Sequence, residues 1–181
     1  APWFCTDPLL VFFFVTAMAC ARLWMDAKGR RWPVGLGFFA CCALATLTKG
    51  PVGLVLPCAI VVGGLLLEGR WRDLWRFPWI PGGLLYVALV APWYVAYAME
   101  AGQGKLSTVL LRENISRFLH AWNNVQPWYF YFGRFPLSFL PWAVFLPVTV
   151  WALVRLARPE EKPALRWIAL WFVVVFVFFS A

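Results

Sequence analysis

Residues 8–25, PLLVFFFVTAMACARLWM, form an apolar run of 18 residues in which Arg22 is the single charged residue. A helix needs about 20 apolar residues to cross a hydrocarbon core of about 30 Å. The run is therefore predicted to be a transmembrane helix, and it indicates the fold class of the whole chain.

The composition supports this prediction. The 181 residues are 63% hydrophobic and only 13% charged, whereas about 25% of an ordinary soluble domain is charged. A soluble domain of this length cannot bury so much apolar surface, so we expect lipid to cover it. The predicted fold is an all-α integral membrane protein, a bundle of transmembrane helices.

Five further apolar runs bring the predicted number of spans to six. They cover residues 34–48, 51–67, 79–99, 128–154 and 167–181. The runs 34–48 and 51–67 have 15 and 17 residues, which give about 22 and 25 Å of helix. Because both fall short of the bilayer, either the bilayer is thinned there or the turn between them lies below the surface in a cavity lined by other helices, where Lys49 would be partly buried. The last run stops with the chain, so we expect an internal fragment of a single membrane domain.

The basic residues predict the topology. Eleven of the 16 Lys and Arg residues follow the first, third and fifth runs or end them: Arg22, Lys28, Arg30, Arg31, Arg70, Arg72, Arg76, Arg155, Arg158, Lys162 and Arg166. Cytoplasmic loops carry such an excess. The net charge of +8 is thus explained by topology, and no nucleic-acid partner is expected. The opposite, extracytoplasmic side receives residues 1–7, the turn at Lys49 and residues 100–127.

The segment 100–127 is too polar to span. Its apolar residues recur at helical spacing and its polar residues lie on the other face, which predicts an amphipathic helix on the outer surface. The apolar positions are Leu111, Ile115, Phe118 and Trp122, and the polar ones are Glu113, Arg117 and His120.

Two residues at the outer ends of the predicted helices could bear chemistry. Asp7 precedes Pro8 and can cap the first helix, but its carboxylate could equally hold a sugar hydroxyl or a metal ion. Lys49 ends the second helix, where the helix dipole favours a cation. An ionisable residue at membrane depth also indicates a functional site. Together with the free amides that begin the third helix, Lys49 could bind a phosphate.

The outer segment offers further candidates, each with a structural alternative. Glu113 and Arg117 can form an ordinary ion pair on a solvated helix face. His120 is the single histidine, so a metal site there needs other ligands, such as Glu113. Aromatic residues at the membrane boundary form an interfacial belt, but they can also stack on sugars or polyprenyl chains. Three of these are Trp128, Tyr129 and Tyr131. The five cysteines have no metal-binding spacing.

An ordered series of short motifs spans nearly the whole chain. It consists of TDPLL at 6–10, LTKGP at 47–51, PWY at 92–94, REN at 112–114 with RF at 117–118, QPWYFY at 126–131 and FLPW at 139–142. The series resembles the dolichyl-phosphate-mannose protein mannosyltransferases of glycosyltransferase family 39, a group with the GT-C fold that includes bacterial aminoarabinose transferases for lipid A.

The resemblance implies a multi-pass enzyme of the bacterial inner membrane. Such an enzyme transfers a sugar, with inversion, from a polyprenyl-phosphate donor to a protein or lipid hydroxyl at the periplasmic face. It further implies that Asp7 is the second acidic residue of the site, that Lys49 contacts the donor phosphate together with Arg117, and that Glu113 and the aromatic residues bind substrate. A divalent metal ion at His120 is a weaker implication. The presumed general base of the family lies upstream of Ala1, so we expect the fragment alone to be inactive.

Two other functions fit the residues. A transporter or channel could use broken helices and a buried charge near Lys49, although transporters often show internal repeats and none is visible here. A structural scaffold would leave Lys49 without a purpose.

Overall fold

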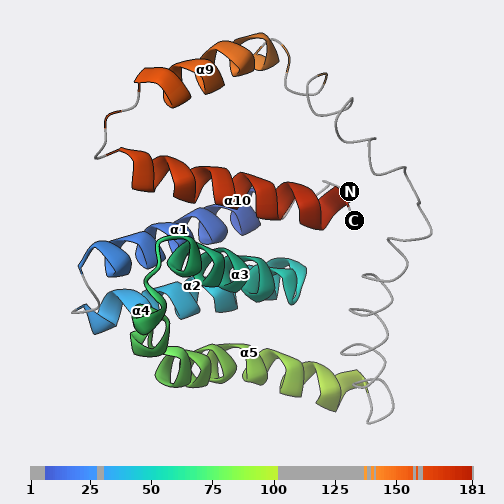
Figure 1. Cartoon of the computed structure of the whole chain (residues 1–181). Coiled ribbons are helices and arrows are strands. Elements are labelled where there is room, and N and C mark those ends of the chain that lie inside the picture. Colours follow the sequence, from blue (N-terminus) through green and yellow to red (C-terminus); the bar gives the residue numbers. More distant parts are fainter. Residues whose placement is uncertain are drawn as a thin grey trace. The chain divides into compact units, whose positions relative to one another are not determined.

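The computed structural model describes residues 7–27, 31–101, 137, 140, 142–156, 158 and 161–180. Within these residues every regular element is a helix (Figure 1). The chain divides into two compact units, Ala1–Asn123 and Asn124–Ala181. The first holds α1 (Asp7–Asp26), α2 (Trp32–Lys49), α3 (Val52–Leu67), α4 (Trp71–Arg76) and α5 (Trp79–Ala101). The second holds the 3₁₀ helix η3 (Trp142–Phe145), α9 (Leu146–Leu156) and α10 (Lys162–Ser180).

Three helices of the described part are long and apolar enough to cross a membrane, namely Asp7–Asp26, Trp32–Lys49 and the Trp79–Tyr97 part of α5. Many of their large apolar side chains point outward; on α5, for example, Ile80 and Leu84 are exposed. Such surfaces are stable when lipid covers them. The prediction of an all-α membrane protein is confirmed.

The second helix is longer than predicted. We expected it over residues 34–48, which is too short to span the membrane, but α2 has 18 residues and a length of about 27 Å. The reason is Pro33, which lies in the first turn of α2, where its fixed φ and missing amide are favourable. With 16 residues, α3 remains short.

Other predicted segments overlap the structure in part. The helix expected from residue 167 begins at Lys162, because Pro163 is again tolerated in a first turn. Of the run 128–154, the described residues are 137, 140 and 142–154, which include η3 and most of α9. The segment 100–127 lies outside the described residues, apart from the last two residues of α5, so the amphipathic helix predicted within it stays a prediction. The count of six spans and the single domain stay predictions.

The first unit is organised around α2, which packs against α1, α3 and α5. An aromatic cluster closes the end of this unit where α2 begins. Its centre is the buried Phe77, whose ring centroid lies 4.8 Å from that of Trp24 and 4.8 Å from that of Trp79. Phe38 and Phe39 of α2 complete the cluster at 5.4 and 5.8 Å from Phe77.

Two adjacent glycines of α5 test this packing. A Cβ atom on Gly82 would clash with the Phe39 ring, whereas one on Gly83 would meet nothing within 4 Å. Overpacking of this kind costs about 1–3 kcal/mol, so Gly82→Ala is expected to lower the melting temperature of the full-length protein in detergent. Gly83→Ala is expected to leave it unchanged or raise it, because alanine is the better helix former. Equal effects of the two substitutions would contradict the close approach of α5 to α2.

Candidate functional site

The structure brings Asp7 and Lys49 together. Nζ of Lys49 lies 2.6 Å from Oδ1 of Asp7, and the side chains are 45% and 58% exposed. The two residues are 42 positions apart in the sequence, so the fold alone makes them neighbours. A carboxylate and an ammonium group therefore share one end of the helix bundle.

The arrangement follows from the packing of α1 and α2. Asp7 is the first residue of α1 and Lys49 is the last residue of α2, and the two packed helices run in opposite directions. Each charge is favoured by the dipole of its own helix, the anion at an N-terminus and the cation at a C-terminus. The two charges thus pair with each other at this end of the bundle before any ligand binds.

The turn after Lys49 fixes the direction in which the chain leaves α2. Gly50 has a φ of 87° and its amide donates to the Thr46 carbonyl at 2.7 Å. This left-handed φ is accessible mainly to glycine. A Cβ atom on Gly53 would lie 2.6 Å from the Ala45 carbonyl carbon, so the start of α3 packs directly on the last turns of α2.

The predicted contribution of the α3 amides needs correction. The amides of Gly53, Leu54 and Val55 donate to the carbonyls of Gly50 and Pro51 at 3.0–3.1 Å. These donors were expected to be free for a phosphate, but the tight turn already uses them. Of the groups at this turn that were predicted to bind a phosphate, the Lys49 ammonium group remains the main candidate.

Sequence reasoning missed a polar contact one turn below the ion pair. The Tyr86 hydroxyl of α5 donates to the Thr46 hydroxyl of α2 at 3.2 Å, and Thr46 is buried. Hydrogen bonds of this kind join helices in membranes. No sequence spacing relates positions 46 and 86, so only the packing of α5 on α2 could reveal the pair.

The remaining candidate residues lie outside the described part of the chain. They are Glu113, Arg117, His120, Trp128, Tyr129 and Tyr131. The described residues contain no group of three His, Cys, Asp or Glu side chains that could hold a metal ion. The metal site at His120 stays a prediction.

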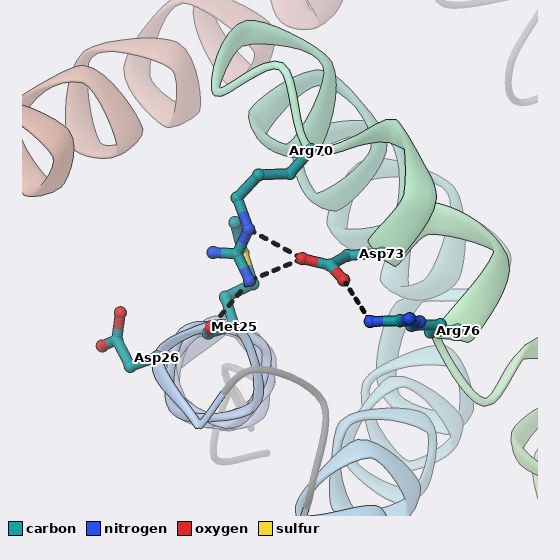
Figure 2. A pocket seen from close by; sticks show the side chains of 5 residues that line it. All are labelled: Met25, Asp26, Arg70, Asp73 and Arg76. Atoms are coloured by element: carbon teal, nitrogen blue, oxygen red, sulfur yellow. Dashed lines mark hydrogen bonds and ion pairs between the residues drawn. The ribbon is translucent and has the colours of Figure 1, made fainter.

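A second charged cluster lies at the opposite ends of α1 and α3. Arg70 donates to Asp73 at 2.8 Å, to Glu68 at 3.3 Å and to the Met25 carbonyl at 2.8 Å. Figure 2 shows Asp73 between Arg70 and Arg76. These three residues help to line a pocket of about 480 Å³. Arg22 bridges the same region by pairing with Glu68 at 3.0 Å. The charges of this cluster are largely paired with one another, which indicates a structural clamp.

Comparison with known proteins shows to which proteins the chain is related. The chain is 31% identical over 182 residues to an undecaprenyl phosphate-α-4-amino-4-deoxy-L-arabinose arabinosyl transferase of Pseudomonas aeruginosa, a match that covers 93% of this chain. A transferase of the same name from Proteus mirabilis is 29% identical over 97% of the chain. The chain is related to part of these transferases. It spans 31% of the length of each of these two relatives.

An uncharacterized protein of Aquifex aeolicus is also similar, with 33% identity over 76% of the chain. No family model matches the sequence, and no solved structure matches it. The relatives described here are named as aminoarabinose transferases or left uncharacterized, and none is named a mannosyltransferase or a transporter. The similarity thus supports the wider family that the motifs predict, through its aminoarabinose branch.

Proposed function

We propose that the full-length protein is a membrane glycosyltransferase that transfers 4-amino-4-deoxyarabinose from undecaprenyl phosphate to a hydroxyl group at the outer face of a bacterial inner membrane. The observation that carries the proposal is the Asp7–Lys49 pair, 2.6 Å apart, in a chain related to transferases named for this donor. A lipid acceptor is preferred over a protein acceptor, since the motif resemblance includes enzymes that act on lipid A.

The chemistry assigns distinct roles to the two charges. The acceptor oxygen attacks the anomeric carbon, the bond from that carbon to the phosphate oxygen breaks, and undecaprenyl phosphate leaves with the electron pair. Positive charge placed at the developing negative charge lowers the barrier, and Lys49 supplies it. The acceptor proton goes to a general base, for which the motif resemblance implies an aspartate upstream of Ala1.

Asp7 keeps Lys49 in place until the donor arrives. Ion pairs between half-exposed side chains contribute little stability, about 0–1 kcal/mol. Lys49 can therefore exchange the Asp7 carboxylate for the donor phosphate at low cost. In the proposed complex the Asp7 carboxylate interacts with a hydroxyl or ammonium group of the sugar.

The proposal is tested with the purified full-length protein in detergent. Incubation with undecaprenyl-phosphate aminoarabinose and lipid A is expected to release undecaprenyl phosphate and to yield aminoarabinosylated lipid A, both measured by mass spectrometry. A parallel reaction with polyprenyl-phosphate mannose and a hydroxyl-bearing peptide tests the mannosyltransferase branch. Turnover of the mannose donor alone would overturn the choice of sugar, and turnover of neither donor would overturn the proposed activity.

A further inference from the structure

The short helix α4 is held rigidly although it is only six residues long. Isolated helices of this length are unstable in water, so its neighbours must stabilise it. At its start the Arg70 guanidinium binds Asp73 at 2.8 Å. At its end the Trp79 indole donates to the Leu74 carbonyl at 2.7 Å, and the Asp73 carbonyl accepts from the amide of the buried Phe77 at 2.9 Å. The fold thus presents α4 in one fixed orientation.

The exposed residues of α4 form two stripes along the helix. Trp71 and Trp75 are 69% and 88% exposed. Arg72 is exposed, and the Arg76 side chain is 70% exposed. Residues four apart share a helix face, so the two tryptophans form one stripe and the two arginines form the next. The remaining side, with Asp73, faces the protein.

The two stripes suit the boundary between hydrocarbon and headgroups. Exposed tryptophan in water leaves a large apolar surface uncovered, whereas at a membrane interface the ring lies among headgroups and upper acyl chains. The position of α4 agrees, because it joins the apolar helices α3 and α5 at the end of the unit that is rich in charged residues.

We propose that α4 binds anionic phospholipid headgroups. In the topology on which the proposed function rests, these belong to the cytoplasmic leaflet. Trp71 and Trp75 lie at the level of the glycerol and upper acyl chains, and Arg72 and Arg76 bind the lipid phosphates. Among the described residues Arg72 forms no ion pair, and Arg76 has a single long one, 3.8 Å to Asp73, so both guanidinium groups are available.

A lipid is favoured over a free phosphate because a phosphate site would account for the two arginines but not for the two exposed tryptophans. Charge complementarity gives the sign of the headgroup. Arg72 and Arg76 are both cationic, and Asp73 is already occupied by Arg70 at 2.8 Å. The exposed surface of α4 is thus positive beside an apolar stripe, as expected for a site that takes anionic lipid.

The test uses the full-length protein in detergent, titrated with phosphatidylglycerol and followed by native mass spectrometry. Each basic residue near a membrane surface contributes about a factor of five in affinity for acidic lipid. Arg72→Gln/Arg76→Gln is therefore expected to weaken the tightest phosphatidylglycerol binding about 30-fold. The matched control, Arg155→Gln/Arg166→Gln, removes the same charge from exposed positions of the second unit and is expected to leave that binding event unchanged.

The proposal would be overturned by an equal loss in both double variants, by unchanged binding in the α4 variant, or by equally tight binding of phosphatidylcholine. Inorganic phosphate is titrated in parallel, and binding as tight as that of the lipid would show an anion site without lipid specificity and would likewise overturn it. If the double variant unfolds, Arg72→Gln alone provides the test, with an expected loss of about five-fold.

Discussion

Lys49→Ala in the full-length protein is expected to reduce sugar transfer from undecaprenyl-phosphate aminoarabinose by about 10²- to 10³-fold. The substitution removes the ammonium group that lies 2.6 Å from Asp7 and that we assign to the leaving phosphate. The turn that carries it should survive, because its backbone hydrogen bond from Gly50 to Thr46 does not involve the Lys49 side chain. The measurement is the initial rate of undecaprenyl phosphate release.

The control for charge is Lys162→Ala, which removes a lysine from the exposed start of α10 and is expected to leave the rate unchanged. The double variant Asp7→Asn/Lys49→Ala separates the roles of the pair. If Asp7 acts only by holding Lys49, the double variant has the same transfer rate as Lys49→Ala alone. A further loss would show that Asp7 contacts the substrate itself. Wild-type activity of Lys49→Ala would remove Lys49 from the site.

The sequence predicted the helices of the first unit well, because apolar runs and turn residues are local signals. α1 extends over Asp7–Asp26 against a predicted 8–25, and α3 over Val52–Leu67 against 51–67. Counting alternate ends also predicted that Asp7 and Lys49 lie on one side of the membrane, and the structure places them at one end of the helix bundle. Their direct contact could not be predicted, since it depends on which helices pack together.

The predictions that were wrong also have identifiable physical causes. The segment with Arg70, Arg72 and Arg76 was interpreted as a basic loop, because a helix of six residues is too short to show helical periodicity. Residues 71–76 form α4, which is stabilised by the bond from the preceding Arg70 to the distant Met25 carbonyl and by the indole of the nearby Trp79. The amides at the start of α3 were expected to be free, because the sequence cannot show that Pro51 and Gly50 turn back to accept their hydrogen bonds.

Arg70→Met is expected to destabilise the first unit by about 2 kcal/mol. Arg70 binds Glu68 and Asp73, whose side chains are 16% and 17% exposed, and it also donates to the Met25 carbonyl. Removing one partner of a largely buried ion pair leaves charges that are poorly solvated, at a cost of about 3–5 kcal/mol when burial is complete. Partial exposure of this cluster reduces that cost. Loss of the clamp also releases α4 from the end of α1.

The measurement is the apparent melting temperature of the full-length protein in detergent, which we expect to fall by several degrees. Arg76→Met is the matched control, because its side chain is 70% exposed and reaches the same Asp73 only at 3.8 Å. Exposed pairs of this kind contribute about 0–1 kcal/mol, so the control should melt close to the wild type. Equal melting of the two variants would mean that Arg70 is solvated in the membrane-embedded protein and that α4 is held by its aromatic contacts alone.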